Sequence, residues 1–234
     1  MTMRWVVTDE FERLVYPLMG NINKVAIVGG SAGDPEMRWL KINKPSVQFY
    51  YFGIEPASIE MDEGGGWTYL DLNQDQGDQV YKYDLVFCAQ VLEHVWDVKQ
   101  ALRNLVSLSA PGRFIFINCP ASCRSHGSPD YYSAGYQPQA LINLLTNMDV
   151  EPLFSGVIGS SRAYCFEHQL RQWPEKNQYY HPLGLHLSSQ KNFIHAIVLW
   201  IRHLPQNIVA MTKKSKPNSN IDTAIQSYVL ARKI

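Results

Sequence analysis

An apolar run that stops abruptly at a glycine-rich turn most constrains how this chain can fold. Residues 24–28 (KVAIV) form the run, and residues 29–33 (GGSAG) form the turn. Asp34, Pro35 and Glu36 follow, a capping residue, a proline suited to the first helical position and an acidic first turn, so a helix is expected to begin here. A buried strand, a tight turn and a helix in this order predict an α/β sheet with a ligand site at the carboxyl ends of its strands.

The alternation of strand and helix patterns continues along the chain. Strand-like runs occupy 47–54, 67–72, 84–88, 113–118, 150–157 and 227–234, and helical spacing occupies 9–20, 92–108 and 137–148. Such alternation indicates βαβ units. We therefore expect an α/β Rossmann-like fold whose seven-stranded, mostly parallel sheet is flanked by helices.

The chain of 234 residues is long enough for one domain with an insertion. We expect an N-terminal helix in 1–20, a ligand-binding core in 21–158 and a closing strand in 222–234. Residues 159–221, rich in aromatics and histidines, are expected to form a helical insertion before the last strand. This insertion is a candidate cap over the acceptor side of the site.

Charge and hydropathy remove several classes of protein. Lysine plus arginine and aspartate plus glutamate are 21 each, so the basic surplus usual for proteins that neutralise duplex phosphates is absent. No apolar run reaches the roughly 18 to 20 residues of a transmembrane segment. The longest, 193–201, is expected to be a buried helix, with a face that touches a membrane as the alternative. The chain starts without a secretory signal pattern, so a cytoplasmic location is expected.

The four cysteines are expected to be reduced thiols. Cys119, Cys123 and His126 form a C-x3-C-x2-H run that resembles half of a zinc site. A closed zinc site needs four ligands, and no second pair stands at a familiar spacing, so no metal is predicted.

Several polar residues fall where the predicted strands end. Glu55 follows the second strand, about 20 residues beyond the first glycines, where a carboxylate can accept hydrogen bonds from ribose hydroxyls. Asp71 and residues 88–90 stand at two further strand ends. The glycines at 29, 30 and 33 do not have the G-x-G-x-x-G spacing, which argues against a nicotinamide-dependent oxidoreductase.

Residues 83–120 resemble the central part of class I S-adenosylmethionine-dependent methyltransferases. The matching features are Asp84 in a D-x-V strand, the V-L-E-H-V motif at 91–95, the dipeptide at 111–112 and Pro120. The resemblance extends over about 24–145 and includes the last strand. It departs from the family's pattern at Ile27, where an acidic residue is usual, and at Ser31, where the middle glycine is usual.

The resemblance implies S-adenosylmethionine as cofactor and gives each matching position a role. The turn would wrap the methionine part, Glu55 would hold the ribose, Asp71 and the Leu72 N–H would face the adenine, and Gln90 would line the pocket. The implied cofactor-binding residues are Gly29, Gly30, Ser31, Gly33, Glu55, Asp71, Leu72 and Gln90.

The stretch 126–132 (HGSPDYY) resembles a loop of methyltransferases that act on small molecules or sugars. It suggests His126 or Asp130 as the general base for methyl transfer to a small-molecule or sugar-like acceptor, at oxygen or nitrogen. Tyr131 and Tyr132 would line the acceptor pocket or pack the loop. His94 is expected to be structural. Because of Ile27 and Ser31, a non-catalytic module that binds a nucleotide or a partner is the alternative, and the oligomeric state is left open.

Overall fold

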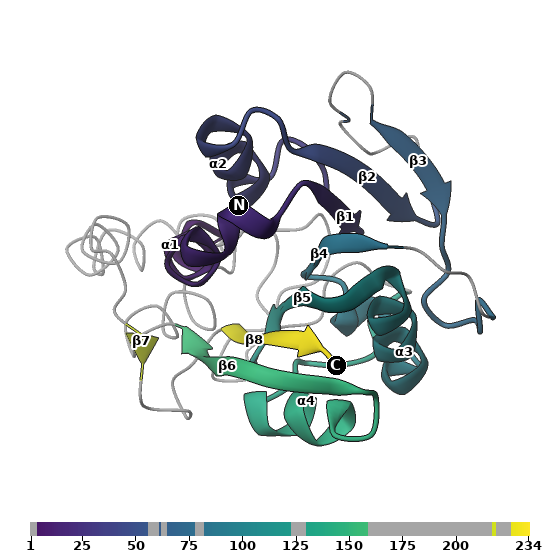
Figure 1. Cartoon of the computed structure of the whole chain (residues 1–234). Helices are drawn as coiled ribbons and strands as arrows, with labels where there is room; N and C mark the ends of the chain where they lie inside the picture. The colour runs from purple at the N-terminus through teal and green to yellow at the C-terminus, as the bar shows by residue number, and fades with distance from the viewer. Residues whose placement is uncertain are drawn as a thin grey trace, which may run out of the picture.

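A single twisted sheet with helices on both faces organises the protein (Figure 1). The computed structural model describes residues 4–55, 61, 65–77, 82–122, 130–158, 217–218 and 226–234. The strands are β1 (Lys24–Val28), β2 (Gln48–Gly53), β3 (Gly66–Tyr69), β4 (Tyr83–Ala89), β5 (Ser109–Pro120), β6 (Val150–Ile158), β7 (Pro217–Asn218) and β8 (Gln226–Lys233). The helices are α1 (Arg4–Val15), α2 (Pro35–Asn43), α3 (Val98–Leu108) and α4 (Pro138–Leu145), with short 3-10 helices η1 (Tyr16–Asn21) and η2 (Leu92–His94).

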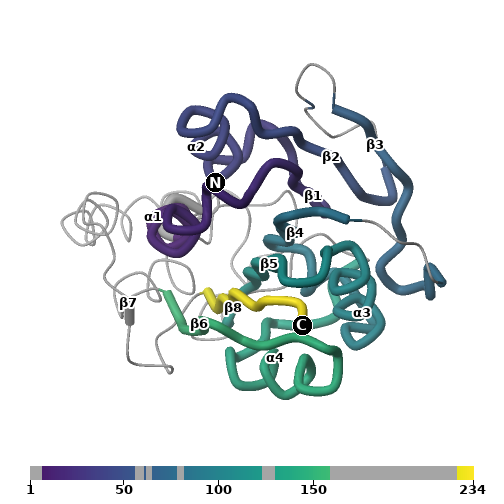
Figure 2. The backbone as a smooth tube through the Cα atoms, viewed as in Figure 1, coloured from purple at the N-terminus to yellow at the C-terminus, as the bar shows by residue number. Residues whose placement is uncertain are grey.

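The strand order is β3-β2-β1-β4-β5-β8-β6-β7. Strands β1 to β5 pair in parallel, and β8 lies antiparallel between β5 and β6. The predicted mostly parallel sheet of seven strands is confirmed, with the two-residue β7 added beside the end of β6. Strands β1 and β4 lie side by side at its middle (Figure 2). Their carboxyl ends therefore lie close to each other.

Two apolar layers hold the helices on the sheet. Helices α1 and α2 pack on one face, where the buried Phe11 ring meets Phe87 and Phe116 edge to face at centroid distances of 5.4 and 5.1 Å. Helices α3 and α4 pack on the other face, around Leu102, Leu105 and other buried apolar side chains. Central strands covered on both faces have to be continuously apolar, which explains the run in β1.

Several predicted element boundaries are wrong. The N-terminal helix predicted over 9–20 begins earlier, at Arg4, and changes to η1 after Val15. The helix predicted over 92–108 is interrupted: η2 covers Leu92–His94, and α3 starts only at Val98. Asp97 caps α3 by accepting a hydrogen bond from the Gln100 N–H at 3.0 Å, while Asn73 Oδ1 accepts those of Trp96 and Asp97. The strand predicted over 67–72 ends at Tyr69, so Asp71 lies in the turn that follows it. Of the predicted insertion, 159–216 and 219–221 lie outside the described residues.

A polar cluster of the buried Glu10 and Tyr228 with the exposed Arg13 fixes α1 to β8. The Arg13 guanidinium donates two hydrogen bonds to the Glu10 carboxylate, at 2.5 and 3.0 Å, and Tyr228 on β8 is hydrogen-bonded to the same carboxylate. Burial opposes ionisation of Glu10, but the bonds to Arg13 and Tyr228 prevail and lower its pKa. Burial of the phenol, together with Glu10, raises the pKa of Tyr228 to about 12. The cluster therefore makes the free energy of unfolding depend on pH.

This arrangement predicts how stability changes in alkali. The pKa of Tyr228 is raised above its unfolded value of about 10, so its contribution is fully present below pH 10 and is lost as the pH rises toward 12. Urea unfolding should show that wild-type stability falls by about 1–2 kcal/mol more than that of Tyr228→Phe between pH 9.5 and 11.5. The exposed Tyr69→Phe serves as control and should follow the wild type. Equal slopes for Tyr228→Phe and wild type would contradict the assignment.

Candidate functional site

The glycine turn after β1 is shaped by the protein's own packing. Gly29 has φ of +66°, and its N–H donates to the Phe52 carbonyl at 2.8 Å. A Cβ atom at Gly29 would lie 2.5 Å from Val91 Cγ2, closer than real contacts allow. The left-handed backbone and the neighbouring side chain both require glycine here. The turn after β1 is thereby fitted to the segment that follows β4.

A carboxylate fills the inside of the same turn. Asp34 stands at the N-cap position of α2, as predicted, but its side chain makes no capping bond. Instead Asp34 Oδ2 accepts from the Ser31 N–H at 3.0 Å, and it would lie 2.6 Å from a Cβ at Gly30. Ile27 is fully buried beneath the turn. Asp34 therefore brings to this turn the negative charge that position 27 lacks, a role that sequence reasoning missed.

Glu55, Asp71 and Leu72 lie beyond the ends of β2 and β3. Glu55 is exposed, and its carboxylate has no hydrogen bond to another described residue. Asp71 accepts from the Asn73 N–H and from Gln74 Nε2, both at 2.9 Å, yet each carboxylate oxygen can accept a further bond. The buried Asn104 of α3 donates to the Leu72 carbonyl at 3.0 Å and so holds this turn against the helix. The helical spacing of 92–108 did not predict that Asn104 would bind this turn.

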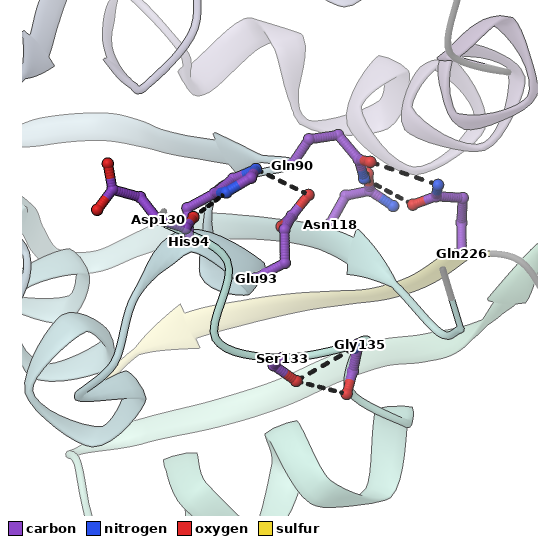
Figure 3. Close-up of polar contacts among 8 residues, drawn as sticks. All are labelled: Gln90, Glu93, His94, Asn118, Asp130, Ser133, Gly135 and Gln226. Atoms are coloured by element: carbon purple, nitrogen blue, oxygen red, sulfur yellow. Dashed lines mark hydrogen bonds and ion pairs between the residues drawn. The ribbon is translucent and has the colours of Figure 1, made fainter. Parts of the chain in front are cut away.

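Three amides meet at the ends of β4, β5 and β8. Gln90 donates from Nε2 to Asn118 Oδ1 at 2.8 Å and to Gln226 Oε1 at 2.6 Å (Figure 3). Asn118 is fully buried, whereas the other two are partly exposed. Gln90 was predicted as a site residue, but Asn118 and Gln226 were missed. Since Gln226 lies 136 residues from Gln90 in sequence, only the strand order joins them.

The Leu-Glu-His motif holds the loop that contains Asp130. His94 Nδ1 lies 2.5 Å from the Asp130 carbonyl oxygen, and the Glu93 carbonyl accepts from the N–H groups of Tyr132 and Ser133 at 2.9 and 3.2 Å. These contacts support the structural role expected for His94. The Asp130 carboxylate points away from the three amides (Figure 3). Tyr131 packs edge-on against His94, Tyr132 is exposed, and His126 lies outside the described residues.

The buried Cys88 beneath this motif is not a reactive thiol. Burial, together with the neighbouring Glu93 carboxylate, raises the pKa of Cys88 far above its ordinary value. A thiol that stays protonated is a poor nucleophile and a poor metal ligand. Among the described residues no three His, Cys, Asp or Glu side chains gather as a metal site would require. In the same part of the chain no helix is long and apolar enough to cross a bilayer.

A surface hollow of about 550 Å³ lies elsewhere, between α1 and α2. Its lining comes from Asp9, Glu12, Arg13, Tyr16, Trp39 and Asn43. None of the predicted site residues borders it. The predicted site residues therefore lie at the strand ends and not at this hollow.

The strand order arranges the site residues in a row. Across six adjacent strands the residues just beyond or near the carboxyl-side ends are Asp71, Glu55, Gly29, Gln90, Asn118 and Gln226. Five steps of about 4.8 Å between neighbouring strands give an edge of about 24 Å. This length is that of several chemical groups side by side.

Comparison with known proteins gives matches in structure only. No family model matches the chain, and no curated protein matches it. A proposed sarcosine dimethylglycine methyltransferase from Galdieria sulphuraria is 13% identical with a TM-score of 0.55, over 97% of this chain and 86% of that one. Coclaurine N-methyltransferase, solved with N-methylheliamine and S-adenosylhomocysteine, is 9% identical with a TM-score of 0.52, over 96% and 72%.

An S-adenosylmethionine-dependent methyltransferase from Archaeoglobus fulgidus is similar over nearly the whole of both chains. It is 14% identical with a TM-score of 0.52, over 98% of this chain and 94% of that one. At such identities the likeness shows a shared fold. The fold predicted from the strand pattern and the Leu-Glu-His segment is thereby confirmed.

The fit between Gly29 and Val91 can be tested with a matched pair of glycines. Gly112 also has a positive φ, +73°, but a Cβ there meets nothing within 4 Å. We expect Gly112→Ala to cost about 1 kcal/mol from the left-handed backbone alone. Gly29→Ala should cost about 1–3 kcal/mol more, because the new methyl overpacks against Val91.

Denaturant unfolding of both variants measures the difference. The double variant Gly29→Ala/Val91→Ala should show a favourable coupling energy, because the methyl that causes the overpacking has gone. Equal losses in the two glycine variants, or no coupling with Val91, would contradict the close contact.

Proposed function

We propose that this chain, which has the class I methyltransferase fold, binds S-adenosylmethionine and transfers its methyl group to a small-molecule acceptor. The observation that carries the proposal is the row of strand-end residues, with a carboxylate beyond β2, an acidic turn beyond β3 and a glycine turn beyond β1. Ligands of open α/β sheets bind at this edge, where the strand order reverses. The order here reverses between β1 and β4.

The residues present fit such a cofactor. Glu55, with no hydrogen bond to another described residue, would accept two hydrogen bonds from ribose hydroxyls. Asp71 can accept a hydrogen bond from an exocyclic amine while it keeps its bonds to Asn73 and Gln74. The turn formed by Gly29, Gly30, Ser31 and Gly33 would surround the amino-acid end of the cofactor. The side chain of Asp34 would supply the negative charge of this turn. When bound, S-adenosylmethionine supplies an activated methyl group.

The protein's part in the reaction is mainly orientation and the exclusion of water. Displacement at a methyl carbon needs the acceptor in line behind it, so the residues around the acceptor decide the rate. His126 and Asp130 remain our candidates for the general base that removes a proton from a hydroxyl acceptor. Tyr131 and Tyr132 stand next to them in sequence and would line the acceptor pocket. We propose O- or N-methylation of a small or sugar-like acceptor, with residues 159–221 as its cap.

One observation favours a second candidate, a non-catalytic module that binds a nucleotide or a partner. The Ser31 N–H already donates to Asp34 at 3.0 Å, so one backbone donor of the turn is occupied within the protein. Ile27 adds no charge there. A module with this turn would bind the amino-acid end of the cofactor weakly. It would still bind the nucleoside end through Glu55 and Asp71.

Calorimetry with S-adenosylmethionine, S-adenosylhomocysteine and adenosine separates the two candidates. The proposal predicts one site that binds the first two more tightly than adenosine. Glu55→Gln should weaken S-adenosylhomocysteine binding about tenfold, because one charge-assisted acceptor is lost. Glu151→Gln on β6, which changes an exposed carboxylate paired with Arg232, is the matched control and should bind as wild type does.

The outcomes are distinct. Equal affinity for adenosine and the two cofactor forms would favour the non-catalytic module. No binding at millimolar ligand by a protein with a cooperative unfolding transition would reject the methyltransferase proposal. Retained binding in Glu55→Gln would remove the ribose role of that residue only.

A further inference from the structure

The hydrogen bonds of the three amides at the ends of β4, β5 and β8 fix which way each amide faces. Asn118 Nδ2 donates to the Ser227 carbonyl of β8 at 2.9 Å, so its oxygen has to face Gln90. Gln90 therefore presents Nε2 to that oxygen, and the second proton of the same nitrogen goes to Gln226 Oε1. Reversing any of the three amides would place two donors or two acceptors against each other.

This assignment leaves one acceptor and one donor available. Gln226 Nε2 donates to Gln90 Oε1 in a hydrogen bond of 3.5 Å, longer than the usual 2.7–3.2 Å. An amide oxygen accepts two hydrogen bonds and an amide nitrogen donates two, so both atoms have capacity to spare. Gln90 and Gln226 are partly exposed, whereas Asn118 behind them is fully buried. The two spare positions therefore belong to the two side chains that solvent can reach.

The backbone supports a purpose for the Gln90 side chain. Gln90 has φ of +59°, a left-handed conformation that glycine adopts without strain and that costs other residues roughly 1 kcal/mol. Its N–H donates to the Asn118 carbonyl at 2.9 Å, which holds that conformation. Strained residues of this kind gather at functional sites. In this conformation the side chain joins Asn118 and Gln226.

The amides also lie on a particular side of the proposed cofactor site. The strands β4, β5 and β8 follow β1 in the sheet, whereas Glu55 and Asp71 lie beyond β2 and β3 on its other side. A ligand held by Glu55, Asp71 and the turn at Gly29 therefore ends where the amides begin. All three amide side chains are neutral, so they offer hydrogen bonds without charge.

We propose that Gln90 and Gln226 form the acceptor subsite and that they bind a neutral hydroxyl group. A hydroxyl donates to Gln90 Oε1 and accepts from Gln226 Nε2 at once. An ether cannot donate and an ammonium cannot accept, so each meets only half of the pair. This inference rests on the proposed function and narrows it to acceptors that carry a free hydroxyl beside the methylated position or at it.

The test uses the whole chain saturated with S-adenosylhomocysteine and a set of cyclohexyl compounds, each with a single polar substituent. Each ring is supplied in three matched forms, with a free hydroxyl, a methyl ether or a primary ammonium. Side-chain NH2 signals of Gln90 and Gln226 are followed by NMR. Both signals are assigned through their backbone resonances in the wild type, and loss of the Gln226 signal in Gln226→Glu checks the assignment. Hydroxyl compounds should shift both signals, whereas the ethers should shift only the Gln226 signal and the ammonium forms only the Gln90 signal, each more weakly.

Gln226→Glu also changes the chemistry of the subsite in a defined way. The carboxylate keeps an acceptor for Gln90 Nε2 but replaces the spare donor by a second acceptor with negative charge. Binding of the hydroxyl compounds should weaken about tenfold, and the ammonium forms should now bind more tightly. Gln139→Glu on α4, which replaces an exposed amide bonded to Asn143, is the matched control and should leave the preference unchanged.

The inference is overturned if no hydroxyl compound shifts the signals, if the ethers shift them equally, or if Gln226→Glu keeps the wild-type preference. The wild-type titration decides between these results even if Gln226→Glu fails to fold. If the chain does not bind S-adenosylhomocysteine, the proposed function fails instead. The same titration is then made on the protein alone, where hydroxyl-selective shifts support the subsite and their absence overturns it.

Discussion

The parallel pairing of β1 with β4 is the constraint on which the rest of the site depends. The register places Val28 opposite Cys88, so the turn at Gly29 and the segment after Ala89 leave the sheet side by side. Their contact is close enough that Val91 excludes any side chain at Gly29. On one side of this pair the sheet continues to Glu55 and Asp71, and on the other to Asn118 and Gln226. A slip in this pairing would separate the two halves of the row.

The Leu-Glu-His motif acts as a structural support in this protein. His94 and the Glu93 carbonyl both bind the backbone of the loop at 130–133, so the loop is tied to the end of β4. The motif therefore carries information about geometry more than about a proton-transfer group. That explains why its presence predicts the fold well while the acceptor has to be inferred from other residues.

Much of the fold could be predicted because the central strands of a parallel sheet are apolar throughout and end at polar turns. The bounds of β1 were predicted to the residue, and the start of α2 followed from Asp34 and Pro35. The break before α3 was missed because helical spacing continues through Val95, whereas capping by Asp97 decides where the helix begins. Periodicity does not report side-chain hydrogen bonds that compete with the helix.

Long-range contacts explain what the sequence could not show about the site. Asp34 was expected to cap a helix, and only the shape of the turn reveals that its carboxylate faces Ser31. Gln226 joins Gln90 because β8 lies next to β5, a neighbour that no local pattern specifies. Roles for Gly29 and Asp71 were implied by the family resemblance, and that of Glu55 also by its place at a strand end; the structure brings these strand ends to one edge.

A crystal structure of the chain with S-adenosylhomocysteine tests the proposed cofactor site most directly. We expect one ligand along the carboxyl edge, with its ribose hydroxyls on Glu55, its adenine by Asp71 and its amino-acid end in the turn at Gly29. The sulfur should then face the amides of Gln90 and Gln226. A well-ordered structure with this edge empty at saturating ligand, or with the ligand bound elsewhere, would contradict the proposed site.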